Sequence, residues 1–167
     1  AGRYCLIMLI GFPAHIDSYG WGALTHIGMA GLLALPFIDK PPRYRLVAAL
    51  VYMALFQYFF AATEYGPWLM ARRMNGGPLG ALSWAFAMLA GTLAADLIGK
   101  HPPAKVFSFM MASGLVLCLA GFSLTFPWPG IKEAWPFTRY GMSAPILLYT
   151  TGIAFFFYLL FFLFYDT

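Results

Sequence analysis

Charged side chains are scarce in this chain. Asp, Glu, Lys and Arg make up 10% of its 167 residues and apolar residues 62%, whereas charged residues account for about 25% of an average soluble domain. Five stretches of roughly 17 to 26 residues contain no charged residue, and a helix of about 20 apolar residues crosses ~30 Å of hydrocarbon. The sequence therefore predicts an all-α, polytopic transmembrane helix bundle surrounded by a lipid bilayer, and excludes a water-soluble fold.

Cysteine and histidine are also rare. The chain has two cysteines, both in apolar stretches, and three histidines. Two cysteines so placed indicate neither a disulfide framework nor a metal site, and a haem would need facing histidines within spans, where only His26 lies. The sequence also lacks a Gly-rich phosphate loop and a GxSxG elbow. We therefore expect no metal ion and no haem.

The uncharged stretches predict five full spans, at residues 22–38, 46–63, 80–98, 106–126 and 144–165. Longer loops are expected at 64–79 and 127–143. The apolar run before Pro13 has only about nine residues, too few to cross, so we interpret it as a truncated N-terminal helix. A signal peptide is the competing interpretation, but no A-x-A-like cleavage site follows. Residues 1–167 then form a single transmembrane domain, expected to be a fragment of a longer polypeptide.

The net charge of +4 does not indicate nucleic acid as a partner, because the basic residues are spread over short loops instead of gathering on one face. Counting alternate loops places six basic residues on one side and four on the other. Basic loops resist translocation, so we expect the six to be cytoplasmic in an integral protein of a bacterial inner membrane. The six are Arg3, Lys40, Arg43, Arg45, Lys100 and Lys105, and the four are Arg72, Arg73, Lys132 and Arg139.

Small residues predict which helices are buried among others, because helices in lipid pack closely only where small side chains let the backbones approach. The span at 80–98 carries such residues every four positions, and the span at 106–126 carries three, so we expect both inside the bundle. The Phe-rich span at 144–165 is expected at its edge. The small residues are Ser83, Ala87, Gly91 and Ala95, and then Gly114, Cys118 and Gly121.

Polar groups inside spans are functional candidates, because they are costly in lipid unless they are paired. His26 and Glu64 are expected near the same membrane surface, where they would form a catalytic acid/base or proton-relay pair. The alternative for His26 is a structural hydrogen bond between helices. We expect Glu64 and Asp96, at helix ends, to be solvated, and Gln57 to join two helices.

Several segments together resemble one family of proteins. The order of these segments is similar to that in bacterial relatives of heparan-α-glucosaminide N-acetyltransferase, a family of polytopic acyltransferases. The sequence differs from the family at His26, where an Arg is expected, and carries extra residues around 138–142. The matching segments are residues 24–28 (LTHIG), 76–84 (GGPLGALSW), 89–91 (LAG), Phe126-Pro127, Lys132, Trp135, Ser143, 149–152 (YTTG) and Asp166.

The resemblance implies a membrane enzyme that takes an acetyl or other acyl group from cytosolic acyl-CoA to a sugar acceptor on the outer side. Acetyl-CoA would be the co-substrate, and cytoplasmic Arg43, Arg45, Lys100 and Lys105 would hold its phosphates. On the outer side, the carbohydrate acceptor would contact Arg72, Arg73, Lys132 and Trp135. The family's reactive histidine lies upstream of the matched region, so missing portions of the same polypeptide would complete the site, and this piece alone is expected to be inactive.

A second hypothesis from another class is a non-enzymatic membrane subunit or carrier, whose few polar groups only fasten helices or line a path. Such a subunit would tolerate Ala at His26 and Glu64 with little loss beyond assembly. A homo-oligomer is compatible with either hypothesis.

Overall fold

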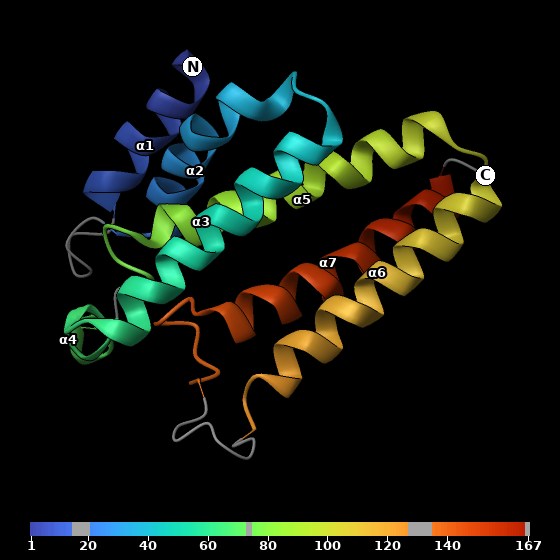
Figure 1. Cartoon of the computed structure of the whole chain (residues 1–167). Helices are drawn as coiled ribbons and strands as arrows, with labels where there is room; N and C mark the ends of the chain where they lie inside the picture. Colours follow the sequence, from blue (N-terminus) through green and yellow to red (C-terminus); the bar gives the residue numbers. More distant parts are fainter. Residues whose placement is uncertain (15–20, 73–74, 127–134, 166–167) are drawn as a thin grey trace.

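The computed structural model describes residues 1–14, 21–72, 75–126 and 135–165. All regular secondary structure in these ranges is helical, which confirms the predicted all-α class (Figure 1). The helices of the described residues are α1 Gly2–Ala14, α2 Ala23–Ile38, α3 Pro42–Ala62, α4 Tyr65–Arg72, α5 Gly80–Lys100, α6 Pro103–Ser123 and α7 Ala144–Tyr165.

Four of these helices, α3, α5, α6 and α7, are long and apolar enough to cross a membrane. The helix α2, predicted as the first full span, has 16 residues, which at 1.5 Å per residue is about 24 Å and short of the ~30 Å hydrocarbon core. It ends before Asp39, which is followed by Lys40 and two prolines. The prediction of five full spans is therefore not confirmed, whereas the character of an integral membrane protein is supported.

Two helices begin earlier than the sequence predicted, and proline is the reason. The helix α3 begins at Pro42 instead of residue 46, and α6 at Pro103 instead of residue 106. The fixed φ of proline suits the first helical position, where its missing N–H costs nothing, and the residue before it is extended. The backbone at Pro41 and Pro102 is extended, with ψ of 148° and 154°. Each Pro pair thus separates two helices and starts the second.

The predicted loop at 64–79 contains the short helix α4, which packs against the end of α3. A tight turn then leads into α5, where Asn75, Gly76 and Gly77 all have positive φ. These conformations are favourable for Gly and tolerated by Asn. A loop was predicted over these residues, but the helix before the turn was not predicted.

The helix α5 lies at the centre of the bundle, in contact with α2, α3 and α7. The helix α1 packs antiparallel on α2, and α6 and α7 run side by side as a hairpin (Figure 1). The hairpin is held at a close backbone approach, since a Cβ on Gly152 would lie 2.6 Å from the carbonyl oxygen of Gly114. The predicted small-residue face of α6 is thus confirmed, and its partner is α7.

The burial of α6, of α7 and of the small-residue face of α5 differs from the prediction. Fewer residues of α6 are buried than of the other three long helices, so α6 lies at the edge of the bundle and α7 lies between it and α5. On α5, Gly91 and Ala95 are exposed, and a Cβ on Gly91 would meet no atom within 4 Å. The face that is buried carries Leu89, Ala90 and Ala94. The small residues of α5 therefore correctly indicated that this helix lies in the interior, but they did not indicate which of its faces is buried.

The bundle has two ends with different chemistry. We call the basic end the residues 39–45 and 99–105, where α2 leads into α3 and α5 into α6. We call the α4 end the residues 63–72, 75–79 and 135–143, where α3 stops and α7 begins. Five of the six basic residues predicted to share a side lie at this end, namely Lys40, Arg43, Arg45, Lys100 and Lys105. Arg3 precedes Tyr4, which lies beside Gly31 near the middle of α2.

Candidate functional site

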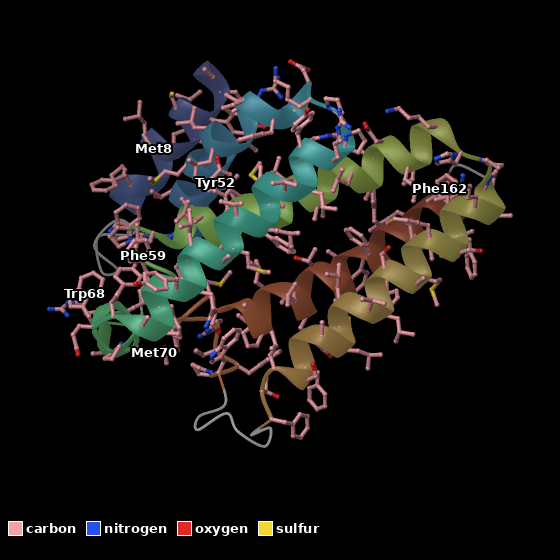
Figure 2. All side chains as sticks on the ribbon, in the orientation of Figure 1. Met8, Tyr52, Phe59, Trp68, Met70 and Phe162 are labelled. Carbon is pink, nitrogen blue, oxygen red and sulfur yellow. The ribbon has the colours of Figure 1, made fainter. Side chains whose placement is uncertain are left out.

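Glu64 and Trp135, predicted respectively as catalytic and as acceptor-binding, line one cavity at the α4 end. The cavity has a volume of about 660 Å³ and lies between the end of α3, the start of α4 and the segment before α7. Phe60 and Met70 contribute apolar walls, and Pro136 lies beside the indole. In Figure 2, Met70 and Trp68 mark this end of the molecule. A carboxylate and an aromatic ring, 71 residues apart in sequence, are thus brought to the same hollow.

The position of Glu64 follows from the way α3 ends. Thr63 is extended, its hydroxyl donates to the carbonyl of Phe59 at 2.5 Å, and its oxygen accepts the backbone N–H of Tyr65. This arrangement satisfies groups at the end of one helix and the start of the next. Glu64 therefore lies in a two-residue link between α3 and α4, with an exposed side chain. Water and a dissolved substrate can both reach its carboxylate.

His26 does not share the cavity with Glu64. The ring is fully buried, with Nδ1 2.9 Å from the carbonyl oxygen of Gly22 and Nε2 2.9 Å from that of Gly77. It stacks on Trp84 at 5.7 Å between ring centroids. Carbonyl oxygens only accept hydrogen bonds and a neutral imidazole has a single N–H, so a neutral ring donates to one of these two carbonyls. The contact with Gly77 is the one that joins α2 to the turn before α5. The geometry favours the structural alternative for His26, and a catalytic role stays a prediction.

The structure does not place the other predicted acceptor-binding residues in this cavity. The guanidinium of Arg72 lies over the ring of Trp68 at 4.9 Å, a cation–π contact on the outside of α4, and Arg72 does not line the cavity. Arg73 and Lys132 lie outside the described residues. The structure thus brings Glu64 together with Trp135, and leaves Arg72 on a neighbouring surface.

Gln57 and Tyr65 hold segments of the α4 end in place through hydrogen bonds. Buried Gln57 of α3 accepts the backbone N–H of Ala144 at 2.8 Å, which confirms that it joins two helices. Tyr65 donates to the carbonyl of Gly76 at 2.6 Å and accepts the N–H of Leu79 at 3.0 Å. Burial raises the pKa of the Tyr65 phenol above its ordinary value. Sequence reasoning missed Tyr65, because nothing local marks a tyrosine that clamps a turn 11 to 14 residues later.

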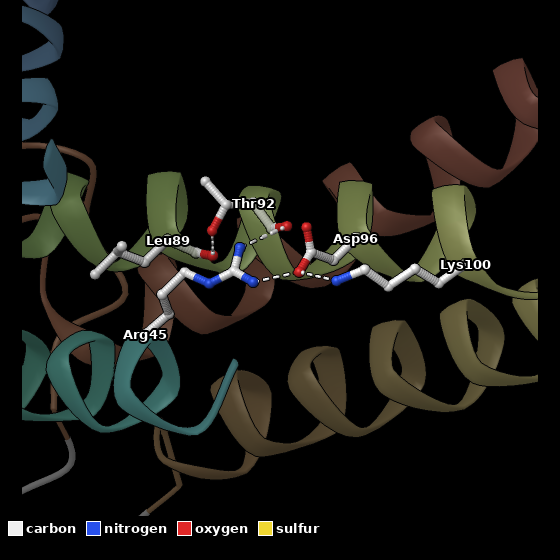
Figure 3. A network of polar contacts seen from close by, with 5 residues as sticks. All are labelled: Arg45, Leu89, Thr92, Asp96 and Lys100. Atoms are coloured by element: carbon white, nitrogen blue, oxygen red, sulfur yellow. Dashed lines mark hydrogen bonds and ion pairs between the residues drawn. The ribbon is translucent and has the colours of Figure 1, made fainter. Parts of the chain in front are cut away.

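At the basic end, Arg45 and Asp96 form an ion pair between α3 and α5 (Figure 3). Arg45 also donates to the carbonyl of Thr92 at 3.2 Å, and Lys100 lies 3.0 Å from the same carboxylate oxygen of Asp96. The prediction that Asp96 is simply solvated is therefore wrong, because its position one turn inside α5 faces Arg45. Arg45 is only 4% exposed, so its predicted role as a CoA ligand is not compatible with its place in this structure.

A second hollow, which we call the lateral groove, lies between the helix pairs α3–α5 and α6–α7. Its volume is about 670 Å³, and apolar side chains form nearly all of its surface. Arg43 and Lys100, both predicted as CoA ligands, lie at its basic end. Lys105, the fourth predicted ligand, is exposed on the first turn of α6 and does not line the groove.

Among the described residues, no three His, Cys, Asp or Glu side chains lie close enough together to hold a metal ion. Comparison of the chain with protein-family models, curated proteins and solved structures found no match.

Proposed function

We propose that this chain is part of a membrane-bound acyltransferase that moves an acetyl or other acyl group from acyl-CoA at the basic end to a sugar acceptor at the α4 end. The observation that carries the proposal is the shared cavity of Glu64 and Trp135. Aromatic rings offer a flat apolar surface against which a sugar ring can pack, and a nearby carboxylate can accept a proton from its hydroxyl or amine.

The chemistry assigned to Glu64 is general-base catalysis. When the acyl group is transferred, its bond to the donor breaks, a new bond to the acceptor oxygen or nitrogen forms, and the acceptor loses a proton. Glu64 is placed to take that proton, because its side chain is exposed and lines the cavity. The resemblance implies that the reactive histidine lies in an outer loop upstream of this region.

The donor would approach the basic end, because polyanionic CoA cannot enter hydrocarbon and cations attract its phosphates. Arg45 is engaged by Asp96, which leaves Arg43, Lys100 and Lys105 as candidates. On this proposal the basic end faces the cytoplasm of a bacterial cell and the α4 end faces outward, as the positive-inside rule predicts.

The test is transfer of radiolabelled acetyl from acetyl-CoA to amino sugars by membranes that contain the full-length protein. General-base catalysis contributes roughly 100-fold or more, so Glu64→Gln is expected to lower the transfer rate by about that factor. Trp135→Ala is expected to raise KM for the sugar. Asp39→Asn is the matched control, because it removes a carboxylate at the opposite end and should leave the rate unchanged. Wild-type rates in both Glu64→Gln and Trp135→Ala would refute the proposal.

A second candidate, a non-enzymatic subunit or carrier, is favoured by the roles of His26 and Gln57, both of which fasten elements together. It predicts that Glu64→Gln and Trp135→Ala leave the parent complex fully active. It also predicts that His26→Ala and Gln57→Ala reduce the amount of assembled complex, measured by size-exclusion chromatography in detergent.

A further inference from the structure

The lateral groove has a shape that suits a hydrocarbon chain. It runs along membrane-spanning helices, and its walls include Leu46 and Leu50 of α3, Leu93 and Leu97 of α5, and Phe109 and Val116 of α6. Several of these side chains are exposed in the bundle itself, so in a membrane the groove is in contact with lipid. A volume of about 670 Å³ falls in the range of small-molecule sites, roughly 300–1,000 Å³.

One end of the groove carries positive charge. Arg43, Lys100 and His101 line this end, and Asp96 is the acidic residue that lines the groove. The carboxylate of Asp96 is already paired with Arg45 and Lys100. The side chains of Arg43, Arg45 and Lys100 carry three positive charges against the one negative charge of Asp96, which leaves an excess of two positive charges. Arg43, whose guanidinium lies over the ring of Tyr44 at 4.9 Å, and Lys100, which shares Asp96 with Arg45, both have exposed side chains. An anion can reach them at the level where a bilayer carries its phosphates.

We propose that the lateral groove binds an anionic phospholipid, with its headgroup between Arg43 and Lys100 and one acyl chain along the apolar walls. A phosphate is common to a phospholipid and to CoA. The adjoining apolar groove favours the phospholipid, because acetyl-CoA brings no chain to fill it. The inference does not rest on the proposed function, and if it holds, a CoA donor would rely on other cations of the basic end, such as Lys105.

The first experiment measures binding of phosphatidylglycerol and phosphatidylcholine with identical chains to the full chain, by native mass spectrometry from detergent. Each Lys or Arg near an anionic lipid contributes a factor of about five, so phosphatidylglycerol is expected to bind at least about fivefold more tightly. The double variant Arg43→Gln/Lys100→Gln is expected to lose this preference. The matched control, Lys40→Gln/Lys105→Gln, removes the same charge at the same end outside the groove and should retain it.

The second experiment tests whether an acyl chain of the lipid lies along the apolar walls of the groove. Val116→Trp adds bulk inside the groove, whereas Leu115→Trp adds the same side chain at the neighbouring exposed position outside it. We expect Val116→Trp to weaken binding of both lipids and Leu115→Trp to bind them as the wild type does. Circular dichroism and size-exclusion profiles establish that each variant is folded.

Four outcomes would overturn the proposal. Equal binding of the two lipids would show that the groove holds bulk lipid without selection. Equal loss of preference in the control pair would assign the effect to net charge. Displacement of phosphatidylglycerol by free CoA, or equally tight binding of a dihexanoyl analogue, would show that the cations alone bind phosphate and that the apolar walls contribute nothing.

Discussion

Arg45 on α3 and Asp96 on α5 are paired at the basic end of the bundle, although they lie 51 residues apart in the chain. Lys100 contacts the same carboxylate oxygen from the exposed side, and the carbonyl of Thr92 accepts a second hydrogen bond from Arg45. The pair neutralises a buried guanidinium and fixes the rotation of α3 against α5. Loss of the pair should therefore weaken the packing of α3 against α5.

Asp96→Asn is expected to lower the free energy of unfolding by about 2–3 kcal/mol, because it leaves the buried Arg45 cation uncompensated. Lys100→Ala, at the exposed partner, should cost less than about 1 kcal/mol. Denaturant unfolding in detergent micelles, followed by circular dichroism, measures both. Equal losses in the two variants would contradict the view that burial of Arg45 makes the pair important.

Gly152→Ala should separate α6 from α7, because the added Cβ would lie 2.6 Å from the Gly114 carbonyl oxygen and the Cys118 sulfur. Overpacking of this kind costs roughly 1–3 kcal/mol. Gly91→Ala is the matched control on an open face of α5, and it should be neutral or stabilising by up to about 1 kcal/mol, since Ala is the better helix former. Thermal unfolding midpoints that fall equally for both variants would refute the close contact.

Gln57→Met should destabilise the start of α7, because the N–H of Ala144 loses its acceptor. A lost helix cap typically costs about 1 kcal/mol. Met has a similar volume and cannot accept this hydrogen bond well, so the effect reports the cap and not a cavity. Hydrogen exchange should become faster in the first turn of α7 and be unchanged at its other end. The exposed neighbour Tyr58, changed to Phe, serves as the control.

Tyr65 predicts a dependence on alkaline pH. Burial raises the pKa of its phenol in the folded state, so its contribution to stability is complete below the ordinary pKa near 10 and is lost as the pH rises through the higher folded value. Tyr65→Phe removes both turn hydrogen bonds and should cost about 1–3 kcal/mol at neutral pH. The stability difference between wild type and variant should shrink above pH 10. A difference that grows there would contradict the direction of the shift.

The positions of the long helices were largely predictable. The limits of α7 agree with the predicted span at 144–165, because they depend only on where charged and turn-forming residues interrupt an apolar run. The start of α6 was misplaced, since a proline pair was interpreted as an interruption when Pro103 also begins the next helix. The helix α4 was missed, because a segment of eight residues with Gly-Pro at its second and third positions resembles a loop.

The candidate site was predictable as a set of residue types but not as a geometry. Glu64 and Trp135 were both selected from the sequence, and the cavity that they share depends on how α4 and the segment before α7 pack on the end of α3. His26 was selected together with Glu64, yet its ring faces the turn at Gly77. Helix register and rotation decide such pairings, and neither is encoded in spacing along one chain.

The sequence by itself determined that this protein is helical and suited to a bilayer, because transfer of a segment from water into hydrocarbon depends on its own composition and length. The tertiary structure alone decided which faces meet, which cation pairs with Asp96 and where the two hollows lie. The physical reason is that lipid is as apolar as the helix surfaces, so hydrophobicity cannot distinguish a lipid-facing side from a helix-facing one. Close packing at sites such as Gly114 and Gly152, together with a few buried polar contacts, makes that distinction.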